Sequence, residues 1–178
     1  MSSELAEGRN ARITVDAGAH MFSCMAFWPV KRQADVLISN GLSTMAFSLP
    51  AAIAMSLETP DRPVIAFTGD GGLLMCAGEL STAAQHAARL CVVVFNDSGL
   101  SLIAIKQEQR QHQRKGVDWP GVDFATVARG FGLQGRTAAN ADQYRDALKT
   151  FLETKGPCLI DVKVDASGYL AQSIALRG

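Results

Sequence analysis

Residues 63–100 constrain the fold more than any other stretch of the chain. Within it, 64–67 and 91–95 are short apolar runs of the kind that form buried parallel strands. Between these runs, residues 78–89 place leucine and alanine at helical spacing. Two apolar strands joined by a helix predict a βαβ unit, in which the strands run parallel and the crossover is right-handed.

Polar residues follow both predicted strands. Gly69-Asp70-Gly71-Gly72 follows the first, where we expect a turn, and Asn96 follows the second. Both therefore lie at the carboxyl ends of parallel strands, the edge at which open α/β sheets bind ligands. The side-chain oxygens of Asp70 and Asn96 suit Mg²⁺ when phosphate oxygens complete its shell. Gly71 and Gly72 lack a Cβ, so their amides can approach an anion closely.

The rest of the chain extends this unit into an α/β fold. We expect further strands at 12–16, 36–39 and 158–164, and helices at 21–32, within 40–55, at 123–131 and at 140–155. In the last helix, Asn140 is the expected N-cap, and the inward residues are Tyr144, Leu148, Phe151 and Leu152. The prediction is a three-layer α/β/α structure with a mostly parallel central sheet, Rossmann-like, in which residues 1–178 form one domain.

Composition excludes several classes of partner. The formal net charge is zero, which gives no reason to expect nucleic acid or an anionic membrane surface. No apolar run has the length of a membrane span, and the polar N-terminus lacks the core of a signal peptide, so we expect a cytoplasmic protein. The four cysteines form no C-x-x-C pair, and we expect neither disulfides nor a zinc site.

The spacing of the two polar turns resembles a known motif. Gly69-Asp70-Gly71, then 24 residues, then Asn96 is similar to the thiamine diphosphate (ThDP) motif of ThDP-dependent enzymes; the alternative is a plain pair of turns. The resemblance implies a ThDP-binding fold with Asp70, Asn96 and the backbone carbonyl of Ser98 as Mg²⁺ ligands. It also implies that Gly69, Gly71 and Gly72 contact the cofactor.

Residues 16–20 read Asp-Ala-Gly-Ala-His at the end of the first predicted strand. By residue type alone, His20 is most simply a capping or core histidine. The segment resembles the D-x-G-x-H sequence of acetolactate synthase-like enzymes, whose histidine contacts the cofactor diphosphate. That resemblance makes His20 a predicted diphosphate ligand, although Ala19 stands where those enzymes commonly have glutamine.

Residues 41–54 resemble the G-L-G-T-M-G-x-x-L-P-A-A-I-G stretch of the same enzymes, with Ser43, Ala46 and Ala54 in place of glycines. By residue type Met45 is a core methionine. The resemblance instead implies that Met45 wedges between the two cofactor rings, while backbone groups of Ser43 and Met45 bind the pyrimidine. Pro50 either kinks the helix or marks its effective start.

The segment after Asn96 says less about function. Residues 100–105 are apolar and predict a short helix that closes over the site. Residues 107–115 are polar and basic, which is typical of a solvated helix end and loop, or alternatively of a mobile lid. The family keeps a longer, aromatic-rich region here, so no substrate preference is implied. The C-terminal tail is an expected docking extension.

The resemblance implies a ThDP- and Mg²⁺-binding domain of a 2-oxo acid decarboxylase or carboligase. Such a domain is incomplete without a pyrimidine-binding domain or subunit, which carries the activating glutamate, so no catalytic residue is assigned here. One alternative is the β-type subunit of a split 2-oxo acid decarboxylase, similar to sulfopyruvate decarboxylase. Another is a non-catalytic assembly module. The apolar segments 21–28 and 100–105 lead us to expect a homo-oligomer or association with the missing domain.

Overall fold

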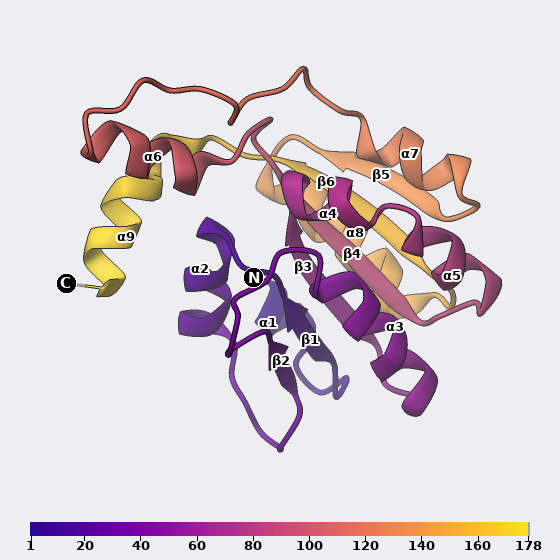
Figure 1. Cartoon of the computed structure of the whole chain (residues 1–178). Helices are drawn as coiled ribbons and strands as arrows, with labels where there is room; N and C mark the ends of the chain where they lie inside the picture. Colours follow the sequence, from indigo (N-terminus) through magenta and orange to yellow (C-terminus); the bar gives the residue numbers. More distant parts are fainter. Residues whose placement is uncertain (178) are drawn as a thin grey trace.

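The computed structural model describes residues 1–177, with side chains up to Ala175, as a twisted sheet with helices on both faces (Figure 1). The sheet has six strands, all parallel, in the order β2-β1-β3-β4-β6-β5. The strands are β1 Arg12–Val15, β2 Val36–Ile38, β3 Val64–Gly69, β4 Leu90–Asn96, β5 Gln134–Ala138 and β6 Cys158–Lys163. The predicted α/β class with a parallel central sheet is confirmed.

The helices are α1 Ser2–Leu5, α2 Ala19–Phe27, α3 Ser48–Glu58, α4 Asp70–Cys76, α5 Glu79–Gln85, α6 Ser101–Gln109, α7 Phe124–Gly130, α8 Ala141–Glu153 and α9 Tyr169–Arg177, with a short 3₁₀ turn at Ala166–Gly168. Helices α2 to α8 connect successive strands, while α1 precedes β1 and α9 follows β6. None of the helices in the part of the chain that the structure describes is long and apolar enough to cross a membrane.

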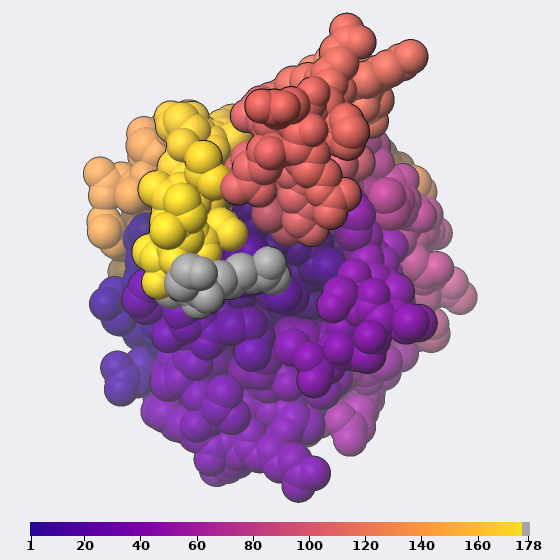
Figure 2. Space-filling view, turned by 60° about the vertical axis from the view of Figure 1, so that its left-hand side comes forward, coloured from indigo at the N-terminus to yellow at the C-terminus, as the bar shows by residue number. Residues whose placement is uncertain are grey.

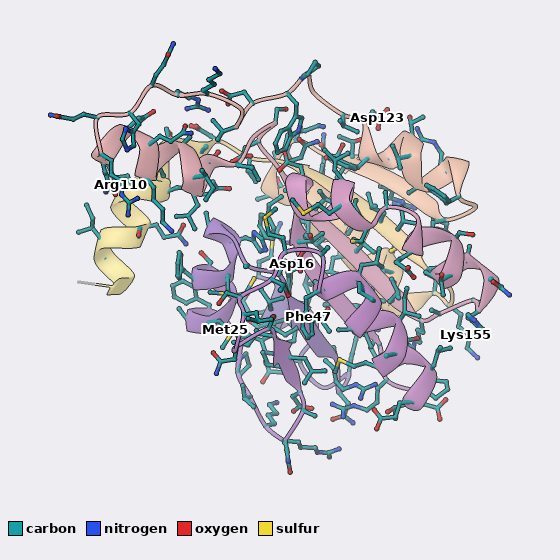
Figure 3. All side chains as sticks on the ribbon, in the orientation of Figure 1. Asp16, Met25, Phe47, Arg110, Asp123 and Lys155 are labelled. Atoms are coloured by element: carbon teal, nitrogen blue, oxygen red, sulfur yellow. The ribbon has the colours of Figure 1, made fainter. Side chains whose placement is uncertain are left out.

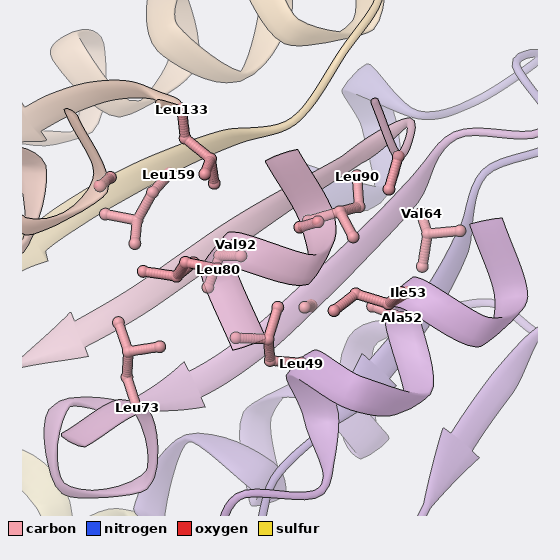
Figure 4. Packing of buried hydrophobic residues seen from close by; sticks show 14 of the residues in the cluster. Leu49, Ala52, Ile53, Val64, Leu73, Leu80, Leu90, Val92, Leu133 and Leu159 are labelled. Atoms are coloured by element: carbon pink, nitrogen blue, oxygen red, sulfur yellow. The ribbon is translucent and has the colours of Figure 1, made fainter. Parts of the chain in front are cut away.

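Strand alternation divides the interior into two cores. In β3, Val64 and Ala66 face one core while Ile65 and Phe67 face the other. Both faces of these strands are apolar because helices cover both, which is the usual state of a parallel sheet. The first core packs α3, α4, α5 and α7 against the sheet, and Figure 4 shows its leucines, among them Leu49, Leu80 and Leu159, meeting over β3, β4 and β6.

The second core lies under α8, with residues of α1 and α2 at its margin. Tyr144, Leu148, Phe151 and Leu152 are all buried there, as their helical spacing predicts. The N-cap is confirmed as well, because the Asn140 side chain accepts from the Gln143 N–H at 3.0 Å. Local periodicity was sufficient here because α8 has one strongly apolar face.

The glycine tetrapeptide is where the predicted local structure is wrong. Gly69-Asp70-Gly71-Gly72 forms no turn, since α4 begins at Asp70 directly after β3. Gly71 and Gly72 have ordinary φ angles, so they are not needed for a left-handed conformation. They are needed for close packing: a Cβ on Gly71 would lie 2.8 Å from Leu100 Cδ2, and one on Gly72 would lie 2.5 Å from Asp16 Oδ2.

Two helix boundaries and one strand also differ from expectation. The helix predicted over 78–89 already ends at Gln85, because Ala87 adopts a φ of +47° that stops it. The helix within 40–55 begins at Ser48, with Pro50 in its first turn, where proline is tolerated. Strand β5 was not predicted, since its exposed residues Gln134, Arg136 and Thr137 carry no apolar alternation and it lies at the edge of the sheet.

Gly135 gives a test of how tightly α7 packs on this edge strand. A Cβ at Gly135 would lie 2.0 Å from the backbone oxygen of Ala125, which cannot move aside as a side chain can. We expect Gly135→Ala to lower the free energy of unfolding by about 1–3 kcal/mol, measured by urea denaturation. Gly130→Ala is the matched control, because nothing lies within 4 Å of its Cβ position. Equal stability of the two variants would contradict this packing.

Candidate functional site

The carboxylate of Asp16, at the end of β1, holds together the elements around the site (Figure 3). Its Oδ1 accepts from the backbone N–H groups of Phe47 and Ser48, both at 2.7 Å. Its Oδ2 accepts from Ala46 N at 3.2 Å and from Thr68 Oγ1 at 2.6 Å. The buried anion therefore satisfies the free N–H groups at the start of α3 and joins that helix to β1 and β3.

The loop that this carboxylate holds contains two strained residues. Ser43 has a φ of +50° and Ala46 a φ of +63°, a region that costs residues other than glycine about 1–2 kcal/mol. Both positions hold glycine in the pattern that the sequence resembles. Ala54, the third such replacement, lies inside α3 without a positive φ and carries no such strain. Met45 lies between the two strained positions, so its placement is imposed by the loop.

Asp70 and Asn96 occupy neighbouring places at the sheet edge. Gly69 of β3 pairs with Phe95 of β4, and Asp70 and Asn96 are the next residues along these strands. The Asp70 carboxylate accepts from Gly71 N at 2.8 Å and from Gly99 N at 3.2 Å. Burial raises the pKa of Asp70 to about 6, the Gly71 N–H opposes this, and the negative charge of Asp97 adds to the rise.

The amide of Asn96 is held in one orientation. Its Nδ2 donates to the Val122 carbonyl at 3.0 Å and to Asp161 Oδ1 at 2.9 Å. Because both partners are acceptors, the nitrogen must face them and the amide oxygen must face away. Asn96 thus presents the atom that a hard cation prefers.

Ser98 continues the same turn with a φ of +63°. Its carbonyl, the predicted third metal ligand, accepts from Trp119 N at 3.3 Å and keeps a second lone pair. The pairing of residues 98–100 with 117–119 brings Trp119 over Gly71, where its ring meets the side chains of Leu100 and Met45. The Met45 side chain therefore lies close to two large side chains above Gly71.

His20 lies at the start of α2, buried and stacked on Phe95 with ring centroids 5.3 Å apart and an interplanar angle of 11°. Burial lowers the pKa of His20 to about 4, and a hydrogen bond with the backbone of Asp16 acts in the opposite direction. Among the described residues, its Nε2 has no hydrogen-bond partner. A buried ring nitrogen without a partner indicates a position where a ligand atom binds.

Most of the predicted site residues surround one cavity of about 400 Å³ at the carboxyl ends of β3 and β4. Its lining includes most of the predicted cofactor-binding residues: His20, Ser43, Met45, Gly69, Asp70, Gly71 and Gly72. Asn96 and Ser98 do not line it; they lie just behind the wall formed by Phe95, Asp97 and Gly99. The structure thus brings the predicted residues together but sets two of the three predicted metal ligands at the margin of the cavity.

Sequence reasoning missed several residues of the cavity wall. Lys106 comes from α6, beyond the segment 100–105 that was predicted to close over the site, and Tyr169 comes from α9. Burial raises the pKa of Tyr169, and the charges of Asp97 and Asp70 raise it further. Figure 2 shows α9 beside the segment of α6, above the N-terminal part of the chain. No local pattern in the tail could have indicated this, since the contact joins segments far apart in the sequence.

The donor set fits a diphosphate-bound Mg²⁺ better than a metal held by protein alone. Within residues 1–177, no group of three or more His, Cys, Asp or Glu side chains could hold a metal ion. One carboxylate, one amide oxygen and one carbonyl leave ligand positions for phosphate oxygens, which is how Mg²⁺ is usually bound. The partnerless His20 nitrogen and the cavity volume fit the same ligand.

Comparison with known proteins finds a matching family and similar relatives. The family described as "Thiamine pyrophosphate enzyme, C-terminal TPP binding domain" matches residues 16–162. The large subunit of acetolactate synthase isozyme 1 from Escherichia coli (strain K12) is 37% identical over 161 residues, covering 88% of this chain and 28% of that protein. Acetolactate synthase from Bacillus subtilis (strain 168) is 34% identical over 155 residues, covering 87% of this chain and 27% of that protein.

Among solved structures, benzoylformate decarboxylase from Polynucleobacter necessarius superposes with a TM-score of 0.82, covering 93% of this chain and 32% of that one. At 21% sequence identity, this likeness shows the fold. The chain therefore spans between a quarter and a third of the length of the relatives named here.

The strain in the loop predicts opposite effects for two similar substitutions. Ala46→Gly should raise the free energy of unfolding by about 0.5–1 kcal/mol, because relief of the positive φ outweighs the added entropy of the unfolded chain. Ala54→Gly, at an exposed position inside α3, should lower it by about 0.5–1 kcal/mol. Urea denaturation of both variants checks this. A loss of stability in both would contradict strain at Ala46.

Burial of His20 predicts a pH dependence of stability. The folded-state pKa of about 4 lies below the ordinary 6.5. Between these two pH values, the unfolded chain therefore binds a proton that the folded chain does not. Stability therefore falls as pH drops from 6.5 towards 4, by up to about 3 kcal/mol.

The measurement is the difference in free energy of unfolding between wild type and His20→Gln at pH 7 and pH 4.5. This difference should shrink at the lower pH, because the variant lacks the titrating ring. His86→Gln is the matched control, since His86 is exposed and should leave the pH profile unchanged. A profile unaffected by His20→Gln would show that the buried ring does not control it.

Proposed function

The chain belongs to the thiamine pyrophosphate enzymes as their C-terminal TPP-binding domain, and from this premise we propose that it binds ThDP together with Mg²⁺ at the cavity described above. The observation that carries the proposal is the placement of Asp70 and Asn96 directly after the paired residues Gly69 and Phe95, with His20 stacked on Phe95. Asp70 and Asn96 offer oxygen ligands, and His20 offers a buried ring nitrogen without a partner among the described residues.

Each residue has a distinct task in this proposal. Asp70, Asn96 and the carbonyl of Ser98 hold Mg²⁺, whose charge neutralises the diphosphate. An anionic oxygen beside His20 Nε2 would favour the protonated ring and so offset its burial. Bound ThDP supplies the electron sink for cleavage next to a carbonyl group.

Met45, whose side chain lies close to Leu100 and Trp119, supports the cofactor rings. Backbone groups of Ser43 and Met45 bind the pyrimidine edge. The strained loop already holds these backbone groups at the cavity. The glycines at 69, 71 and 72 keep the floor of the cavity free of side chains.

We propose further that the domain acts on 2-oxo acids, as part of a decarboxylase or carboligase, only with a partner. The relatives are about three times as long as this chain, because 88% and 87% of it cover only 28% and 27% of the two acetolactate synthases. Large apolar side chains are exposed on the elements that border the cavity: Met25 and Phe27 on α2, Leu42 before Ser43, and Leu74 and Met75 on α4. A pyrimidine-binding domain or subunit that carries the activating glutamate would cover them, within a homo-oligomer.

The test is calorimetric titration of the chain with ThDP, with and without Mg²⁺. We expect binding that requires Mg²⁺ and is weakened at least tenfold by Asp70→Asn, a change that keeps the side-chain size but removes the charged ligand. Asp142→Asn, which removes an exposed carboxylate at the start of α8, is the matched control and should bind as wild type does. Thermal unfolding confirms that each variant is folded.

Binding that persists without Mg²⁺, or that Asp70→Asn leaves unchanged, would contradict the metal site. Absence of binding even after a pyrimidine-binding domain from an acetolactate synthase is added would contradict the proposed function as a whole.

A further inference from the structure

Asp161 is hydrogen-bonded to Asn96, one of the proposed metal ligands. Resting on the proposed function, we propose that the Asp161 carboxylate sets the orientation of the Asn96 side chain, so that the amide oxygen and not the nitrogen faces Mg²⁺. Asp161 lies on β6, does not line the cavity and contacts none of the other predicted ligands. Its effect on the metal passes through Asn96.

A closed hydrogen-bond network supports this role. Asp161 Oδ1 accepts from Asn96 Nδ2 at 2.9 Å. Asp161 Oδ2 accepts from Phe124 N at 3.2 Å and from Lys163 Nζ at 2.8 Å. The Val122 carbonyl completes the network, since Asn96 Nδ2 and Lys163 Nζ both donate to it, at 3.0 and 3.3 Å. The network thus joins the ends of β4 and β6 to the segment that leads into α7.

The polarity of this network excludes the flipped amide. If the Asn96 side chain rotated by 180°, its oxygen would face the Asp161 carboxylate and the Val122 carbonyl. Two acceptors would then meet an acceptor, and both amide hydrogens would lose their buried partners. Because the negative charge of Asp161 strengthens the bond from Asn96, the observed orientation is strongly favoured.

Burying the Asp161 carboxylate costs free energy unless hydrogen bonds and an opposite charge compensate for it. Its side chain is fully buried between the apolar residues Ile160 and Val162, where a carboxylate is stable only if it is paired and hydrogen-bonded. Lys163, two residues along the same face of β6, neutralises it from the protein surface. Comparable hydrogen bonds behind a metal ligand affect metal affinity by about 10–100-fold.

Asp161→Asn tests the proposal with almost no change in volume. Phe124 N and Lys163 Nζ both donate, so the new amide oxygen must face them and the new NH₂ group must face Asn96. Two donors would then meet, and the Asn96 amide would lose its fixed orientation. We expect the Mg²⁺ affinity in the presence of ThDP to fall about 10–100-fold, measured by calorimetry.

The second readout needs no cofactor. Nuclear magnetic resonance of the metal-free chain should show slow hydrogen exchange of the Asn96 side-chain amide in the wild type and fast exchange in Asp161→Asn. Asp123→Asn is the matched control, because Asp123 also caps the start of α7, through Thr126 N at 2.9 Å, but does not contact Asn96. It should leave both the Asn96 exchange rate and the Mg²⁺ affinity unchanged.

The outcomes separate this proposal from the proposed function. Fast exchange of the Asn96 side-chain amide in the wild type overturns the proposal, whether or not Asp161→Asn folds. A folded Asp161→Asn with protected Asn96 and a Mg²⁺ affinity within about twofold of wild type overturns it as well. If the wild type binds no Mg²⁺ and ThDP even after a pyrimidine-binding domain is added, the proposed function fails, while the exchange measurement still decides whether Asp161 orients Asn96.

Discussion

The buried carboxylate of Asp16 is the interaction on which the arrangement around the cavity depends. It accepts four hydrogen bonds, three from the backbone at the start of α3 and one from Thr68 on β3. Without these bonds, the N–H groups of residues 46–48 would be buried without partners, and the loop could relax from its strained conformation. The same carboxylate leaves no room for a side chain at Gly72, so one anion determines both the loop and the first turn of α4.

The same kind of support holds the candidate site residues. A neighbouring side chain or backbone group contacts each of them. Asn96 is oriented by Val122 and Asp161, His20 is stacked on Phe95, and Met45 lies close to Leu100 and Trp119. Such support places ligand atoms before the ligand arrives and lowers the entropic cost of binding. Strain at Ser43 and Ala46 belongs to the same arrangement, since packing imposes it near the proposed cofactor.

Local sequence patterns were sufficient wherever a segment's structure depends on its own residues. The apolar runs of β3 and β4, the capped helix α8 and the spacing of Asp70 and Asn96 were all readable in this way, because a βαβ unit joins sheet neighbours through one crossover helix. The glycine tetrapeptide was misread because glycine favours turns locally, whereas here close contacts with Leu100 and Asp16 require it inside a helix.

The sequence by itself therefore determined the fold class, the sheet edge that forms the site and the residues of Gly69-Asp70-Gly71 and Asn96 that identify the family. Only the tertiary structure decided what supports them: Asp161 behind Asn96, Tyr169 in the cavity wall and Trp119 over Gly71. These contacts join segments far apart in the sequence, as in Asn96 with Asp161, 65 positions away. No local periodicity encodes such contacts, because they exist only once the strands have paired and the helices have packed on the sheet.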